Sequence, residues 1–291
     1  MTLLNLGSIN ADHIYRLAHL PGAGETLAAT GYAVGLGGKG ANQSVAAARA
    51  GATVRHLGAV GADGVWARER LAGFGVDVTA VAVRDDVATG HAIVQVDADG
   101  ENAIVIWPGA NRALDPAKLD AALTGLGPGD SLLLQNETNL QLEAAAAARA
   151  AGLRVIASAA PFEVAAVKAI LPHVSILLLN AVEAAQLQAA LGTPPEALGL
   201  EAVVITRGAA GAEWIGRDAR LTVPAPRVQA VDTTGAGDCF AGWLAAGLDA
   251  GQPPDAALRA AVTAAAVQVT RPGASEAMPD AAEVAARLAA G

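Results

Sequence analysis

Small residues beside a carboxylate form the most informative stretch of this sequence, Asp232–Asp238, which reads Asp-Thr-Thr-Gly-Ala-Gly-Asp and precedes the apolar run Cys239–Leu248. Small residues at a helix start let successive backbone N–H groups converge on an anion, aided by the positive end of the helix dipole. Asp238 would lie in the first turn, where it could accept a proton from an alcohol during phosphoryl transfer. For an isolated Gly-x-Gly-Asp, a capped glycine turn is the more common interpretation.

A second glycine-rich stretch, Gly35–Gln43, fits the G-x-G-x-x-G pattern of dinucleotide-binding folds. That fingerprint follows the first core strand of a βαβ unit, whereas here a polar segment separates the first predicted strand from the glycines. It is not a Walker A loop either, because Gly40 follows Lys39 where Ser or Thr is required. We interpret it as a turn that brings backbone close to a polar ligand, with Lys39 and Asn42 as side-chain donors.

A third polar stretch, Gly7–His13, follows the first predicted strand. In parallel sheets, ligands collect at the carboxyl ends of the strands. Asn10 and Asp12 are two apart on extended chain and would point the same way. An amide beside a carboxylate suits neighbouring sugar hydroxyls, which need both donors and acceptors. An Asx-type turn explains this segment equally well when it is taken alone.

The elements that must position these groups alternate between short apolar strands and Ala-rich helices, the pattern of a parallel sheet covered on both faces. The strands are predicted at Leu3–Leu6, Val54–Val60, Ser131–Gln135, Arg154–Ser158, Ser175–Leu179 and Ala202–Thr206. The helices are predicted at about Gly40–Ala50, Asp63–Phe74, Leu140–Ala151, Glu163–Leu171 and Ala181–Leu191. After Gly235 the order changes to three helices, predicted at Ala236–Asp249, Pro254–Val269 and Pro279–Ala290.

Two segments, about 12–36 and 88–107, do not follow this alternation of strands and helices, and short strands are predicted in both. The turn Asp97–Gly100 joins the strands of the second segment. We interpret them together as a small β-sheet lid over one end of the main sheet. No Pro/Ser-rich linker, charge block or repeat divides the chain, so residues 1–291 are predicted to form one α/β domain with a lid.

The composition excludes several classes of protein. The net charge of −9 argues against nucleic acid or an anionic membrane as a partner. The longest uncharged stretch, Ala169–Val182, is shorter than the about 20 apolar residues that a membrane span needs. The first residues lack the basic start of a signal peptide, and the single cysteine, Cys239, excludes an intrachain disulfide and a Cys-rich zinc site. We expect a cytoplasmic protein.

Together these stretches resemble the ribokinase (PfkB-type carbohydrate kinase) family, and the similarity runs over nearly the full length. It is carried by Gly7–His13, Gly37–Gln43, Asn180–Glu183, Thr206–Gly211 and Asp232–Asp238. The last is the most specific signature of the family, and the first two point to members that act on ribose. The resemblance implies a three-layer α/β/α sandwich with a mostly parallel central sheet and a small β-sheet lid.

The resemblance also implies the chemistry: transfer of the ATP γ-phosphate to the 5-hydroxyl of D-ribose, with Mg²⁺ required, K⁺ as an activator and a homodimer formed through the lids. Asp238 corresponds to the base, beside an anion hole of Gly235, Ala236 and Gly237. The positions that match the sugar contacts are Asn10, Ala11, Asp12, Gly38, Lys39, Gly40, Ala41, Asn42, Glu137 and Asp238, with Ala92 and Ile106 on the lid side. The positions that match the ATP contacts are Asn180, Thr206, Arg207, Gly208, Ala209, Ala210, Gly211, Gly237, Asp238 and Val262. Glu183 matches the Mg²⁺ position, acting through water, and the K⁺ site maps to Asp232, Thr234, Gln268, Arg271 and Gly273.

Several positions depart from the family pattern. Ser158–Pro161 reads Ser-Ala-Ala-Pro where relatives often carry Asn-Pro-Ala-Pro. Val262 stands where His or Asn often lies near the adenine, and Ala277 stands where a serine often contributes to the potassium site.

Other functions remain open from the sequence. They are another kinase of the same family acting on fructose, a deoxy-sugar or a nucleoside, a non-catalytic sugar or nucleotide sensor, and an NAD-dependent oxidoreductase suggested by Gly35–Gly40 alone.

Overall fold

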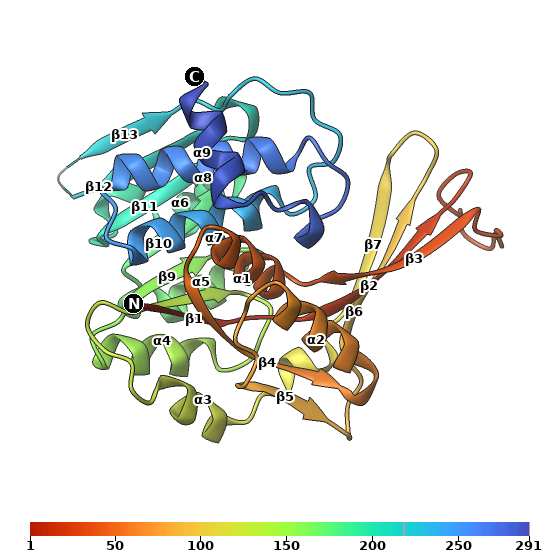
Figure 1. Cartoon of the computed structure of the whole chain (residues 1–291), viewed down its shortest axis with the longest axis horizontal. Coiled ribbons are helices and arrows are strands. Elements are labelled where there is room, and N and C mark those ends of the chain that lie inside the picture. Colours follow the sequence, from red (N-terminus) through yellow and green to blue (C-terminus); the bar gives the residue numbers. More distant parts are fainter. Residues whose placement is uncertain (218, 291) are drawn as a thin grey trace.

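The structure is a computed structural model that describes residues 1–217 and 219–290, and in these residues thirteen strands form two separate sheets (Figure 1). The main sheet has nine strands in the order β13 (Arg220–Val223), β12 (Ala212–Gly216), β11 (Ala202–Thr206), β10 (Ile176–Asn180), β9 (Arg154–Ser158), β8 (Ser131–Gln135), β1 (Thr2–Leu6), β4 (Thr53–Gly61) and β5 (Val81–Arg84). In this sheet order, every pair of neighbouring strands from β11 across to β5 is parallel. The strand β12 is antiparallel to both of its neighbours, β11 and β13.

Helices cover both faces of the main sheet. One face is packed by α1 (Lys39–Arg49), α2 (Val65–Gly73), α7 (Ala236–Asp249), α8 (Pro254–Gln268) and α9 (Ala281–Ala289). The other is packed by α3 (Pro116–Leu123), α4 (Gln141–Ala150), α5 (Val164–Ile170) and α6 (Ala181–Leu191). Alternate strand residues serve the two cores: Leu3 belongs to the first and Leu4 to the second. The predicted three-layer α/β/α architecture is confirmed.

The sequence predicted most of these elements closely and missed some. All six predicted core strands are present, and α6 and α7 have the predicted bounds. The predicted helix Asp63–Phe74 divides into a 3₁₀ turn at Ala62–Gly64 followed by α2. Four elements were not predicted from the sequence: α3, β5, β12 and β13.

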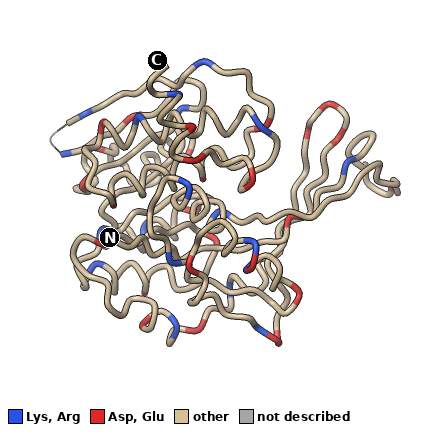
Figure 2. The backbone as a smooth tube through the Cα atoms, viewed as in Figure 1, with Lys and Arg blue, Asp and Glu red and all other residues tan. Residues whose placement is uncertain are grey.

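The second sheet is smaller and lies to one side of the main body (Figure 1). Its strands follow the order β3 (Gly31–Gly37), β2 (Asn10–Arg16), β6 (Gly90–Val96) and β7 (Asn102–Trp107), with β2 and β6 parallel. All six residues of β7 are exposed. Figure 2 shows acidic residues at the tip of the β6–β7 hairpin, where Asp97, Asp99 and Glu101 lie.

The helices of residues 1–217 and 219–290 include none that combines the length and the hydropathy needed to cross a bilayer.

Candidate active site

The helix α7 begins beside the carboxyl ends of the central strands. Its N-cap, Gly235, has a φ of 78°, a left-handed conformation that favours glycine. The Cys239 N–H donates to the Gly235 carbonyl, and the Ala236 N–H donates to the Thr233 carbonyl. The N–H groups of a helix's first turn lack acceptors inside the helix, so those of Gly237 and Asp238 are the ones oriented to receive an anion.

Two side-chain amides hold the Asp238 carboxylate, which is 7% exposed. Asn42 Nδ2 donates to Oδ2 at 3.0 Å, and Gln43 Nε2 donates to Oδ1 at 2.9 Å. Ser275 Oγ in turn donates to Asn42 Oδ1 at 2.6 Å. Each Asp238 oxygen keeps further lone pairs for a substrate hydroxyl.

Glycines allow the start of α1 to approach β1 and β2. A Cβ on Gly40 would lie 2.3 Å from the Ser8 nitrogen, and a Cβ on Gly37 would lie 2.0 Å from an Asp12 carboxylate oxygen. The Gly40 N–H donates to Ser8 Oγ at 3.2 Å, and the Ala41 N–H donates to the Ser8 carbonyl at 2.8 Å. The glycine-rich stretch therefore joins β3 of the small sheet to α1, and the Asp12 side chain of β2 packs against its Gly37.

Charged groups concentrate around this turn. Burial, together with the charges of Glu137 and Asp238, raises the pKa of Asp12 to about 6. The charge of Asp238, with smaller contributions from Glu137 and Glu183, raises the pKa of Lys39. Lys39 is therefore a cation among three carboxylates, the partner that makes their close approach tolerable.

Glu137 follows β8 and is held at the same place. Its Oε2 accepts a hydrogen bond from the Ser8 hydroxyl and another from the Lys39 N–H at 3.0 Å. Because both bonds use Oε2, the other oxygen can accept from a ligand.

Asn10, at the start of β2, is oriented by Asn111. Asn111 Nδ2 donates to Asn10 Oδ1 at 2.7 Å, and Asn111 Oδ1 accepts from the Ile9 N–H at 2.9 Å. With its oxygen engaged, Asn10 presents its N–H₂ to a ligand.

Two adjoining pockets open at the start of α7. The polar pocket, of about 250 Å³, is lined by Lys39, Asn180, Glu183, Gly237 and Asp238 among others. The apolar pocket, of about 560 Å³, is lined by Ala225, Pro226, Val228, Val262 and Val269 among others. Thr206, Thr233, Ala236, Gly237 and Phe240 line both. A ligand with an apolar end and a polyanionic end fits across the boundary.

The segment Thr206–Gly211 borders both pockets, though not with every residue. Thr206, Gly208, Ala209 and Gly211 line the apolar pocket. Arg207 instead donates to Glu213 Oε2 at 2.8 Å, which anchors the loop to β12.

The pair Asn180 and Glu183 forms a capping box at the start of α6. Asn180 Oδ1 accepts from the Glu183 N–H at 2.9 Å, and Glu183 Oε2 accepts from the Asn180 N–H at 2.7 Å. Glu183 Oε1 stays available to the polar pocket.

The loop before α7 is tied to the chain after α8. Asp232 accepts from the N–H groups of Thr234 and Gly273, both at 2.9 Å. Gln268 Nε2 donates to the carbonyls of Thr234 and Gly273 at 2.8 and 3.0 Å, and Gln268 Oε1 is buried without a hydrogen-bond partner. The Arg271 side chain points elsewhere, to Glu283 of α9. Among the described residues, no three His, Cys, Asp or Glu side chains gather as a metal cluster.

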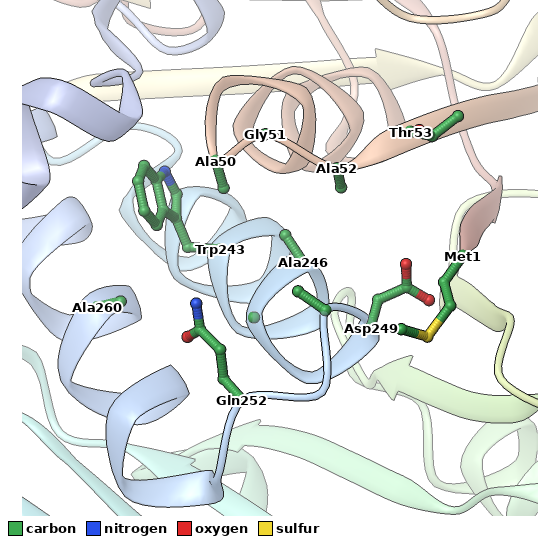
Figure 3. Close-up of a pocket in the computed structure, with 12 residues that line it drawn as sticks. Met1, Ala50, Gly51, Ala52, Thr53, Trp243, Ala246, Asp249, Gln252 and Ala260 are labelled. Carbon is green, nitrogen blue, oxygen red and sulfur yellow. The ribbon is translucent and has the colours of Figure 1, made fainter.

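A further pocket, of about 260 Å³, lies at the opposite end of α7 (Figure 3). Met1, Trp243, Asp249 and Gln252 line it. Asp249 is eleven residues after Asp238, about 16 Å along a helix, so this pocket is separate from the reactive groups.

The family of the chain follows from a match over almost its whole length. Residues 2–281 match the pfkB family of carbohydrate kinases. The chain belongs to the PfkB family. It is therefore a phosphotransferase with an alcohol group as acceptor.

Individual PfkB relatives cover nearly the whole chain. A ribokinase of Haemophilus influenzae is 36% identical over 292 residues, which are 96% of this chain and 95% of that protein. A deoxyribokinase of Salmonella typhi is 33% identical over 96% of each chain. The solved structure of Arabidopsis thaliana ribokinase complexed with ribose and ATP has a TM-score of 0.86 and 30% identity, covering 99% of this chain and 98% of its own.

Four residues of this PfkB site were missed by the sequence analysis: Ser8, Gln43, Asn111 and Ser275. Each contacts a residue that the sequence did single out, namely Glu137, Asp238, Asn10 and Asn42. Ser8 and Gln43 lie inside the motifs themselves. Asn111 and Ser275 are about 100 and 230 positions from their partners, so no local pattern indicates them.

Proposed function

We propose that this protein is an ATP-dependent ribokinase, which transfers the γ-phosphate of ATP to the 5-hydroxyl of D-ribose. The observation that carries the proposal is the position of Asp238, a carboxylate held by two amides in the first turn of α7, at the wall of the polar pocket. The ribokinase relatives, one of them complexed with ribose and ATP, support the choice of ribose.

The sugar is held by side chains from three elements. Asn10 and Asp12 of β2 offer a donor and an acceptor, Lys39 and Asn42 of α1 offer donors, and Glu137 offers an acceptor. Sugar hydroxyls both donate and accept hydrogen bonds, so this alternation fixes one hydroxyl in front of Asp238.

The reaction is a direct displacement at phosphorus. The sugar oxygen forms a bond to the γ-phosphorus as the bond from that phosphorus to the β–γ bridging oxygen breaks, and ADP leaves. Asp238 accepts the hydroxyl proton, while the first N–H groups of α7 and the Lys39 ammonium stabilise the charge on the transferred group. The adenine lies in the apolar pocket against Val262, and the triphosphate crosses Thr206–Gly211 toward Gly237.

A Mg²⁺ ion bound with the nucleotide neutralises phosphate charge. Glu183 fits that ion, because its free carboxylate oxygen lies at the polar pocket beside Asn180, and oxygen is the donor that Mg²⁺ prefers. We assign Glu183 the role of holding the hydration shell of the ion.

A K⁺ ion is the proposed activator, bound near the loop Asp232–Gly235. The carbonyl oxygens of Thr234 and Gly273 both accept from Gln268 Nε2, and Oε1 of the same amide is buried without a hydrogen-bond partner. This oxygen-rich donor set fits a hard cation. Asp232 contributes by holding the loop, and Arg271 by its backbone.

We propose that two copies associate through the small sheet, in the cytoplasm. Ile104, Val105 and Ile106 of β7 are 51%, 68% and 53% exposed, so both faces of this strand are apolar and uncovered. The double substitution Ile104→Lys and Val105→Lys should shift the molar mass in solution, measured by light scattering, from dimer to monomer. A wild-type mass equal to one chain excludes this association.

A substrate panel tests the function. ATP consumption is followed with ribose, 2-deoxyribose, fructose and a nucleoside, and the phosphorylated carbon of the product is identified by ³¹P–¹H NMR. Turnover of another sugar but not of ribose rejects the ribokinase assignment and keeps the kinase. Asp238→Asn should lower kcat at least ~10²-fold, the usual scale for a lost general base, and near-normal turnover of that variant rejects the mechanism.

A further inference from the structure

A chain of buried amides lies behind Asp238 and has no part in the mechanism above. Gln43 Nε2 donates to Asp238 Oδ1, and Gln135 Nε2 donates to Gln43 Oε1 at 2.8 Å. The same Gln135 nitrogen donates to Asn5 Oδ1 at 2.8 Å. Gln43, Gln135 and Asn5 are at most 1% exposed. Buried amides of this kind are costly unless each is paired.

The chain continues from Asn5 to a histidine. Asn5 Nδ2 donates to Ser44 Oγ at 2.8 Å, and Ser44 Oγ lies 2.8 Å from His56 Nδ1. His56 Nε2 lies 3.0 Å from the Gly7 carbonyl. A carbonyl can only accept, so Nε2 carries the hydrogen. Burial lowers the pKa of His56 to about 4, so the ring is neutral and Nδ1 accepts from the Ser44 hydroxyl.

Each bond in this series fixes the direction of the next. The Ser44 hydroxyl donates to His56, so its oxygen accepts from Asn5, which turns Asn5 Oδ1 toward Gln135. Gln135 then uses both of its N–H groups as donors, one to Asn5 and one to Gln43. Gln43 must therefore meet Gln135 with its oxygen and Asp238 with its N–H₂.

We propose that Gln43 is a positioning residue that keeps the Asp238 carboxylate turned toward the sugar hydroxyl, and that Gln135 locks its orientation. The competing partner is Lys39, which lines the same polar pocket as Asp238 and whose pKa is raised by the Asp238 charge. Without the bond from Gln43, only Asn42 holds the carboxylate, and Oδ1 can turn toward that cation and away from the hydroxyl. This inference rests on the proposed role of Asp238 as the base.

Gln43→Met tests the inference, because methionine keeps the length and loses the hydrogen bonds. We expect kcat to fall roughly tenfold or more, the scale of one hydrogen bond to a charged group, with the KM values for sugar and ATP within about threefold, since Gln43 contacts neither substrate in the proposed mechanism. In the Asp238→Asn background, the same substitution should lower kcat by less than about twofold, because the effect passes through Asp238.

Val45→Ala is the matched control. Val45 lies on α1, fully buried in the core, and has no part in the amide chain. The variant Val45→Ala should have a lower free energy of unfolding through lost packing alone, and its kcat should equal that of the wild type. Thermal unfolding shows whether each variant is folded at the assay temperature. Gln43→Glu is the second variant if Gln43→Met does not fold: it keeps the shape and the bond from Gln135 but repels Asp238, so kcat falls as well.

Two outcomes overturn the inference. One is a folded Gln43→Met or Gln43→Glu with kcat within about twofold of the wild type. The other is the same fractional loss from Gln43→Met in both backgrounds, which is the signature of a structural role. Near-normal turnover by Asp238→Asn alone would instead reject the proposed function, so the two failures are distinguishable.

Discussion

Replacing Asp12 by Asn should make the protein more stable and less active. The Asp12 carboxylate lies largely buried over Gly37, near Glu137 and Asp238, and its pKa rises from the ordinary value of 3.8 to about 6. At about 1.4 kcal/mol per pKa unit, ionised Asp12 lowers the free energy of unfolding by about 3 kcal/mol. Asn has the same shape and no charge.

The sign of the effect depends on pH. Because the folded-state pKa is the higher one, the native protein holds a proton between about pH 4 and pH 6 that the unfolded chain has released. The destabilisation from Asp12 is therefore absent below pH 4, grows as the pH rises, and is complete above pH 6. The gain from Asp12→Asn should be about 3 kcal/mol at pH 7.5 and about half of that at pH 5.

Urea unfolding of wild type and Asp12→Asn at the two pH values measures the gain in the free energy of unfolding. Assays at varied sugar concentration measure the loss of activity. The KM for the sugar should rise roughly ten- to hundredfold, since a charged acceptor for a hydroxyl is lost. In the wild type, kcat/KM for the sugar should fall as the pH drops through about 6, when Asp12 gains its proton.

Asp249→Asn is the control for this prediction. Asp249 is 4% exposed, its pKa is raised by burial, and it lies at the far end of α7. Its substitution should also stabilise the protein at pH 7.5, with no change in the KM for the sugar. If Asp12→Asn gives no gain in stability, or the same gain at both pH values, the charge is not the cause and the reasoning is wrong.

Two further predictions concern packing around the ligands. Gly40→Ala places a Cβ 2.3–2.4 Å from the backbone of Gly7 and Ser8, so the midpoint of thermal unfolding should fall sharply. Gly73→Ala is the control, because its Cβ would meet nothing within 4 Å, and its midpoint should fall less. Equal midpoints for the two variants would contradict the close approach of α1 to the chain that follows β1. Val262→Phe fills part of the apolar pocket, so the KM for ATP should rise at least about tenfold with the KM for the sugar unchanged, and an unchanged KM for ATP would place the adenine elsewhere.

The core strands were predictable because their sequences are unbroken apolar runs, as in β8 (Ser131–Gln135) and β11 (Ala202–Thr206), which only a sheet covered on both faces buries. β12 was missed because Glu213 interrupts its pattern. That carboxylate is buried between Arg207 and Arg220, which lie six and seven positions away outside β12 or on the next strand, and the hydrophobic period of a strand does not indicate such pairing. α3 was missed although Asp115 and Pro116 form a usable start signal, a capping Asp followed by Pro at the first helical position.

The motifs could be recognised from sequence, but the way they meet could not. Gln43 lies in an Ala-rich helix where a polar residue ordinarily faces water, and nothing local indicates that its amide is buried against a carboxylate 195 positions away. Asn42 likewise reads as a sugar ligand, whereas in the structure it also supports Asp238.

The meeting of these residues depends on how closely α1 and α7 pack. A Cβ on Gly242 would lie 2.4 Å from the Gln43 carbonyl oxygen and 2.6 Å from the Ala46 side chain, so the two helices touch at that glycine. Asp238 is four residues before Gly242 and lies on the same face of α7. Any larger residue at position 242 must push α1 away and lengthen the bonds from Asn42 and Gln43 to Asp238. The two motifs therefore act as one site because a glycine outside both of them allows the helices that carry them to come into contact.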